Sequence, residues 1–314
     1  MTAKLLLWVV LVGCGSAVPA SRPAPPENRV AAPPACPEDM ALVPRGTFTM
    51  GHTAKNNFDY DGPPHQVALD AYCIDRTEVT VAAYDRCVAA HGCEPAPTTV
   101  DHLPGNPVYA DPGLCNGGKP ALARHPINCV TWNHADRFCR WAGRRLPTEA
   151  QWERSARGDD GRAFPWGDDP PVNDRGGPRV ENRLNFAARD GVDGVSATMP
   201  VGSYPTGASP YGVLDLAGNV SEWTADTIGY YGVAPETNPT GPTDVTASPW
   251  RERWRERFGS DPDGHLNEFR VVRGGGMGFT DPKEYWTYAR GTGLDVKWRD
   301  YDLGFRCAMA AARP

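Results

Sequence analysis

The chain has 314 residues and a formal net charge of −6, and its arginines are scattered among the acidic residues. Because no basic stretch stands out, the composition gives no sign of a nucleic-acid partner. The 34 glycines and 32 prolines exceed ordinary usage and predict a large share of irregular structure.

The first residues predict an export signal. Residues 1–13 carry one lysine and an apolar run from Leu5 to Val12, which is too short to span a bilayer as a mature helix. The run ends in Leu-Val-Gly before Cys14, which resembles the lipobox of bacterial lipoproteins and implies acylation of that cysteine. The alternative is an ordinary secretory signal that is cleaved near Ala17 or Ala20.

Residues 14–35 are rich in proline and alanine and lack apolar periodicity. This composition predicts an extended tether between the membrane and a folded body. We therefore expect a lipoprotein of the bacterial cell envelope, anchored to the membrane and facing the periplasm or the exterior.

Eight cysteines follow Cys14: Cys36, Cys73, Cys87, Cys93, Cys115, Cys129, Cys139 and Cys307. An even number in an exported chain predicts four disulfides. Spacing leaves their connectivity open, although Cys87 with Cys93 would close a short loop after a helix. The cysteines and histidines show neither CxxC nor HxxxH spacing, so a zinc or non-haem iron site is not the preferred hypothesis.

Regular elements are predicted to be few. Capping residues and apolar spacing predict three helices: one after Thr80, one from after Asn133 to Gly143, and one from Thr148 to Gly158. The predicted strands are Leu42-Val43, Thr47–Met50, Gln66–Ile74 and Val271-Val272. Because no linker divides residues 36–314, we expect one α+β domain with low regular secondary structure.

An insertion is predicted at about residues 243–269. Trp250, Trp254 and Phe258 lie four residues apart with arginines between them, which predicts an amphipathic helix on the body of the domain. It either covers a local apolar patch or docks a partner.

The segment Tyr211–Trp223, YGVLDLAGNVSEW, crowds oxygen donors and glycines together. It is predicted to be neither a simple helix nor a strand, because Gly218 allows a turn that a side chain would block. Asp215, Asn219 and Glu222 supply the oxygens that calcium prefers. The segment alone is equally consistent with an Asx-rich surface turn.

Eight motifs then occur in a fixed order, and together they resemble the formylglycine-generating enzyme, or sulfatase-modifying factor, family. They lie at Leu42–Gly51, Ile74–Val88, His125–Gly158, Phe164–Asp169, Tyr211–Trp223, Asn238–Pro242, Arg270–Gly276 and Leu303–Cys307. The resemblance implies a disulfide-bonded variant of the C-type-lectin-like fold.

The resemblance also implies up to two structural calcium ions. The ligands at matching positions are Asp215, Gly218, Val220 and Glu222 for one ion, and Asn185, Phe186, Asp193 and Val195 for the other. The Gly218, Val220, Phe186 and Val195 ligands would be backbone carbonyls. One disulfide, Cys139 with Cys307, is implied as well. Parsimony then pairs Cys36 with Cys73, Cys87 with Cys93, and Cys115 with Cys129.

The family's copper chemistry is not expected here. Catalytic members hold copper between two cysteines, and the matching positions carry Phe279 and Glu284, whereas copper(I) requires soft thiolates. Gly276 replaces the active-site serine, and Ser221 replaces a tryptophan. A further branch of the family binds iron through histidines of an additional helical domain, which this chain lacks.

Other polar candidates near the altered pocket are Glu284, Arg290 and Arg306, with Tyr285, Trp286 and Tyr288 beside them. A structural role is favoured for each, with Arg306 paired to a buried carboxylate. We expect a calcium-stabilised binding or accessory module, with a protein or peptide as its possible ligand. The alternative is an oxidase, or an enzyme that tailors a secreted peptide or siderophore, with a non-standard active site.

Overall fold

The computed structural model describes residues 35–53, 61–100, 113–171, 183–186, 197–241, 269–291 and 294–312. These residues belong to one compact unit. The helices within them are α1 (Val81–Ala89), α2 (Trp132–Trp141) and α3 (Glu149–Arg157), with 3-10 turns η2 (Pro120–Leu122), η3 (Pro205–Gly207) and η5 (Pro282–Tyr285). The strands are β1 (Met40–Val43), β2 (Gly46–Met50), β3 (His65–Leu69), β4 (Tyr72–Asp75), β5 (Ser221–Thr227), β6 (Glu236–Thr237), β7 (Phe269–Arg273), β8 (Leu294–Asp295), β9 (Leu303–Gly304) and β10 (Ala308–Ala310).

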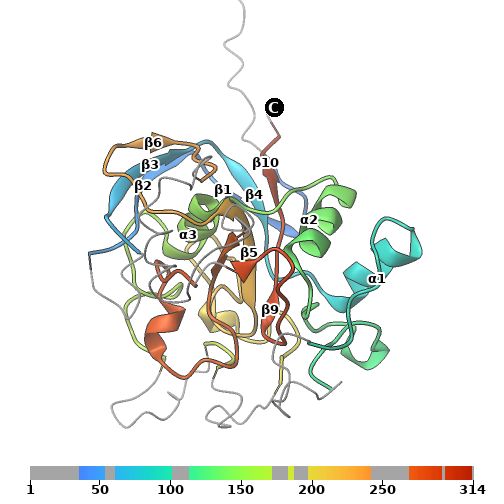
Figure 1. Ribbon diagram of the computed structural model, residues 1–314. Coiled ribbons are helices and arrows are strands. Elements are labelled where there is room, and N and C mark those ends of the chain that lie inside the picture. The colour runs from blue at the N-terminus through green and yellow to red at the C-terminus, as the bar shows by residue number, and fades with distance from the viewer. Residues whose placement is uncertain are drawn as a thin grey trace, which may run out of the picture. The chain divides into compact units, whose positions relative to one another are not determined.

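The described strands form three small sheets from segments that are far apart in the chain (Figure 1). Strand β4 lies between β1 and β10, β3 lies between β2 and β6, and the third sheet has the order β8-β7-β5-β9. In the third sheet, β5 pairs antiparallel with β7 and parallel with β9. This pairing brings the segments after β7 and before β9 toward β5, where the candidate site lies.

The helices begin at the predicted caps. The Thr80 hydroxyl accepts the Ala83 N–H at 3.1 Å, and α3 has the predicted capping box of Thr148 with Gln151 before it ends at Gly158. Helix α2 begins at Trp132, earlier than predicted, because Thr131 forms a capping box with His134.

One predicted strand is wrong. Strands Leu42-Val43, Thr47–Met50 and Val271-Val272 are confirmed within β1, β2 and β7, but the predicted strand Gln66–Ile74 is two strands that join different sheets. The chain turns between them at Asp70, whose N–H donates to Asn238 Oδ1 at 2.9 Å. This contact spans 168 residues, so no local pattern could reveal it.

The Tyr211–Trp223 segment is irregular only in part, because its last three residues begin β5. Asp215, Gly218 and Asn219 have φ angles of 56°, 80° and 59°, a region that L-residues seldom adopt. A Cβ atom at Gly218 would lie 2.3 Å from the Asn185 carbonyl oxygen. Glycine is therefore required where these two segments cross.

The four predicted disulfides are confirmed: Cys36–Cys73, Cys87–Cys93, Cys115–Cys129 and Cys139–Cys307. The last of these joins α2 to the residue before β10. The predicted signal segment, Cys14, nearly all of the tether, and the insertion up to residue 268 lie outside the described residues. In the part of the chain that is described, no helix is long and apolar enough to cross a membrane.

Candidate functional site

A cavity of about 190 Å³ lies beside the third sheet. Its walls come from β5, β7, the glycine loop after β7, η5 and the chain leading into β9. The lining residues are Ser221, Val272, Arg273, Gly274, Gly275, Phe279, Glu284, Ala289, Gly291, Leu294, Trp298, Asp300, Asp302 and Leu303. The structure thus brings together three of the four residues that the sequence places at the family's active site: Ser221, Phe279 and Glu284.

The fourth such residue, Gly276, lies directly beside the cavity. Its carbonyl accepts hydrogen bonds from the Phe279 N–H at 3.2 Å and the Tyr285 hydroxyl at 3.1 Å. A Cβ atom at this position would lie 2.6 Å from Asp302 Oδ2, which is far inside van der Waals contact. The Asp302 side chain therefore occupies space that a serine at position 276 would need.

Sequence reasoning missed Asp302, although it stands directly before the LGFRC motif. Burial, and then the negative charge of Asp300, raise the pKa of the Asp302 carboxyl to about 7. Burial, followed by the charge of Asp281, also raises the pKa of Glu284. Asp302 can therefore exchange a proton close to neutral pH.

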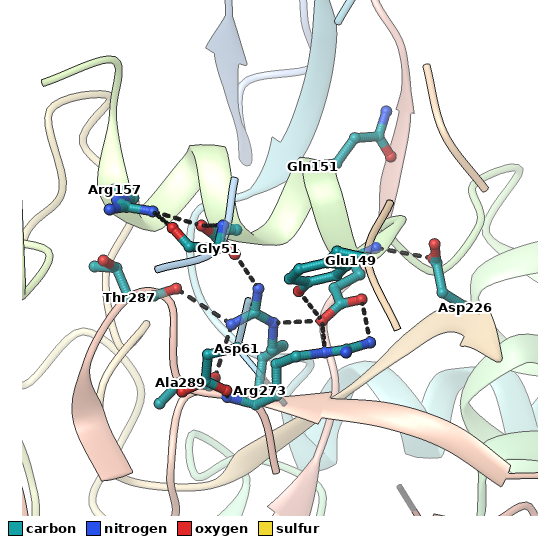
Figure 2. A network of polar contacts seen from close by, with 12 residues as sticks. Gly51, Asp61, Glu149, Gln151, Arg157, Asp226, Arg273, Thr287 and Ala289 are labelled. Carbon is teal, nitrogen blue, oxygen red and sulfur yellow. Dashed lines mark hydrogen bonds and ion pairs between the residues drawn. The ribbon is translucent and has the colours of Figure 1, made fainter. Parts of the chain in front are cut away.

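Arg273 lines the cavity, but its charge is neutralised within the scaffold (Figure 2). Its guanidinium forms a short ion pair with Glu153, contacts Glu149 at 3.2 Å, and donates to the Ala289 carbonyl at 2.7 Å. Arg290 binds the same Glu149 carboxylate through two bonds, at 2.7 and 3.0 Å. This buried pair agrees with the structural role favoured for Arg290.

Arg306 and Glu222 form a second buried ion pair. Arg306 Nε donates to Glu222 Oε2 at 2.6 Å, and Nη2 donates to Oε1 at 2.7 Å. The Trp152 indole N–H donates to the same Oε2 at 2.9 Å. The prediction that Arg306 pairs with a buried carboxylate is confirmed, and that carboxylate is one of the predicted calcium ligands.

The two predicted calcium sites lie close together, and Asn219 connects them. Asn219 Nδ2 donates to Glu78 Oε1 at 2.9 Å, and its Oδ1 accepts from Asn185 Nδ2 at 3.1 Å. Asp215 Oδ2 accepts the Gly202 N–H at 2.6 Å. Asp193 and Val195 lie outside the described residues, while Gly218, Val220 and Phe186 are described and buried.

One buried oxygen in this region, Asn185 Oδ1, has no hydrogen-bond partner among the described residues. Glu78 Oε2 is paired only when a proton lies between the Glu78 and Asp215 carboxyl groups. Burial, and then the charge of Asp215, raise the pKa of Glu78, and burial raises that of Asp215. Unsatisfied buried oxygens fit a bound cation. The described His, Cys, Asp and Glu side chains do not provide a group of three arranged around a metal ion, so amide and carbonyl oxygens would have to supply the remaining ligands.

Comparisons with known proteins agree with this architecture. Residues 27–311 match the family model described as the sulfatase-modifying factor enzyme 1-like domain. The chain is 30% identical to the formylglycine-generating enzyme of Streptomyces coelicolor over 96% of each chain, and 28% identical to the inactive C-alpha-formylglycine-generating enzyme 2 of Mus musculus over 88% of each. Its structure is similar to that of PvdO from Pseudomonas aeruginosa, with a TM-score of 0.64 and 25% identity over 86% of this chain and 94% of that one.

Replacing Asp302 by asparagine should raise stability in a pH-dependent way. The pKa of Asp302 in the folded protein, about 7, lies above its ordinary value of 3.8, so its contribution to stability is present at low pH and is lost as the pH rises through 7. The loss begins near pH 3.8, where the unfolded carboxyl ionises, and is complete above 7. We therefore expect Asp302→Asn to melt close to wild type at pH 4 and several degrees higher at pH 8.5, because about 1 kcal/mol shifts the melting temperature by roughly 2–4 °C.

Thermal unfolding at the two pH values measures this effect. Asp136→Asn is the matched control, because it removes one carboxylate from the pair with the exposed Arg140. A stability gain in Asp302→Asn that is equal at both pH values contradicts the burial of a titrating carboxyl.

Proposed function

Because the chain belongs to the sulfatase-modifying factor family, we propose that it is a binding or accessory module that holds its ligand in the cavity lined by Phe279 and Glu284. In this proposal the domain does not form formylglycine with copper. Family membership fixes the fold, whereas the chemistry depends on the residues that line the site.

The side chains at the two copper-ligand positions support the proposal. Phe279 and Glu284 both line the cavity, and neither a phenyl ring nor a carboxylate replaces the soft thiolates that copper(I) requires. The eight cysteines that follow Cys14 are joined in four disulfides, so they offer no thiolate in the oxidised protein. The chemistry of this donor set does not fit copper.

A second candidate is an oxidase or a tailoring enzyme for a secreted peptide or siderophore, with a non-standard active site. The observation that favours it is Asp302, whose pKa of about 7 suits proton transfer at neutral pH. In this reading Asp302 would accept or donate a proton at a substrate atom in the cavity.

Up to two structural calcium ions are part of the proposal. The described candidate ligands differ in how many acceptor positions they leave open for an ion. Asn185 Oδ1 is buried and without a hydrogen bond among the described residues, as a metal ligand would be. Glu222 accepts three hydrogen bonds from Arg306 and Trp152, and a carboxylate has about four acceptor positions. One position on its Oε1 atom therefore remains for an ion, which would stabilise the loops and take no part in catalysis.

Location at the cell envelope is also proposed. Residues 1–13 would direct export, and an acylated Cys14 would anchor the domain through the proline-rich tether to the membrane. The four disulfides support export, because such bonds persist in oxidising compartments.

The copper prediction concerns the two substituted positions. Wild-type protein should neither bind copper(I) nor change the mass of a peptide that bears the Cys-x-Pro-x-Arg motif under oxygen. The double variant Phe279→Cys/Glu284→Cys should gain copper(I) binding, because it restores two thiolates beside the cavity. Formylglycine formation by the wild type would reject the leading function.

The calcium prediction is tested by melting with and without a chelator. Chelation should lower the melting temperature of the wild type, because a ligand that binds only the folded state stabilises it. Asp215→Ala and Asn185→Ala should each reduce this sensitivity. Glu222→Ala should destabilise even with chelator, by about 3–5 kcal/mol, because it leaves Arg306 buried without its counterion. Identical wild-type melting in both conditions argues against calcium.

The lipid prediction is tested by expressing the full chain in a bacterial host and measuring the mass of its N-terminal peptide. We expect an acylated Cys14 at the new N-terminus and protein in the membrane fraction. Cys14→Ser should remain unacylated. An N-terminus near Ala17 or Ala20 in the wild type would show secretory cleavage instead.

A further inference from the structure

We propose that the cavity lined by Phe279 and Glu284 recognises an alkylammonium group, that is, a primary amine at the end of an apolar stem. Such a group is presented by a lysine side chain or by a free diamine. The inference rests on the proposed function, because it names the chemistry of the ligand that the cavity would hold.

The charge of the lining favours a cation. Three carboxyl groups line the cavity, those of Glu284, Asp300 and Asp302. Arg273 is the basic residue among the described lining residues, and its guanidinium is paired with Glu149 and Glu153. The lining therefore carries more acidic than basic side chains, a balance that would favour a positive group.

The walls of the cavity suit an apolar stem. Phe279 and Trp298 line it together with aliphatic side chains, so methylene groups would be buried on entry. Aromatic rings in general attract cations over their faces. Phe279 is 38% exposed, which places it at the mouth of the cavity, where it would contact the stem of an entering group.

The size of the cavity suits a small ligand. Its volume of about 190 Å³ is below the roughly 300 Å³ at which small-molecule pockets begin. A group the size of one side chain fits the space that the described residues enclose. A compact ammonium has three donors, which matches carboxyl groups from two separate segments better than the planar fork of a guanidinium does.

The close approach of Gly276 and Asp302 explains why this acidic side chain can line the cavity. A Cβ atom at position 276 would lie 2.6 Å from Asp302 Oδ2, so glycine leaves room for the carboxylate. The resemblance places a serine at this position in catalytic relatives. In this chain the glycine instead leaves the space to the Asp302 carboxyl, which lines the cavity.

Two peptides that differ only in the terminal ammonium group of one side chain test the inference. Acetyl-Gly-Gly-Lys-Gly-Gly-amide and its norleucine counterpart are titrated onto the full chain in detergent, with ligand-observed NMR as the measurement. We expect the lysine peptide to bind about tenfold more tightly. Glu284→Gln and Asp302→Asn should each weaken it about fivefold, whereas the surface control Glu94→Gln, which disrupts only the exposed pair with Arg137, should not.

A third probe, 1,5-diaminopentane, distinguishes a free amine from a peptide side chain. If it binds more tightly than the lysine peptide, the ligand is a free amine, and if it binds more weakly, the ligand is a lysine side chain. Equal affinity for lysine and norleucine overturns the ammonium assignment but leaves a binding cavity, and so leaves the proposed function standing. Absence of binding by every probe at millimolar concentration also overturns the assignment. Formylglycine formation in the copper assay removes the proposed function, whichever probe binds.

Discussion

Arg273 carries its charge inside the protein, and the groups that neutralise it hold three parts of the chain together (Figure 2). Two carboxylates come from α3, those of Glu149 and Glu153. The carbonyls of Thr287 and Ala289 accept from the same guanidinium. Because an unpaired buried charge is costly, the end of β7, one side of α3 and the chain after η5 must remain together. The glycine loop that follows Arg273 is thereby fixed beside the cavity.

A second ion pair supports the other side of the same region. Arg306 and Glu222 are both fully buried, and Trp152 connects them to the first network. Its indole N–H donates to Glu222, and the Arg273 guanidinium lies over its ring, 5.6 Å from the centroid. Strand β5, helix α3 and the segment before β10 are therefore coupled through one aromatic side chain.

Local chemistry made much of this fold predictable. The caps at Thr80, Thr148 and Gly158 act within one helical turn, so the sequence alone locates α1 and α3. Within the predicted strand Gln66–Ile74, by contrast, the Asp70 N–H at the turn donates to Asn238, far along the chain. Contacts of that kind have no local pattern, because the partner is chosen by the tertiary fold.

Some residues of the candidate site could be predicted from the sequence, and others could not. Ser221, Phe279 and Glu284 follow from motif positions, since the resemblance aligns them residue by residue. Glu78 and Asp302 do not follow from motif positions, because their contacts form only where distant segments of the chain cross. Asp302 matters because Gly276 lies against it, and Glu78 because Asn219 donates to it. A sequence motif shows which residue stands at each position of the family's site. It does not show which residues from distant segments contact each other, and those contacts appear only in the three-dimensional structure.

The residues that stabilise the fold are different from Phe279 and Glu284, which line the cavity. This difference explains how the residues in the cavity can change without loss of the fold. Loss of one member of a buried ion pair costs about 3–5 kcal/mol, which is a large part of the stability of an ordinary domain. Phe279 and Glu284 stand outside both ion-pair networks and are partly exposed, so their replacement leaves Arg273 and Arg306 paired. Substitutions in the cavity lining are therefore compatible with the fold, whereas loss of a network residue is costly.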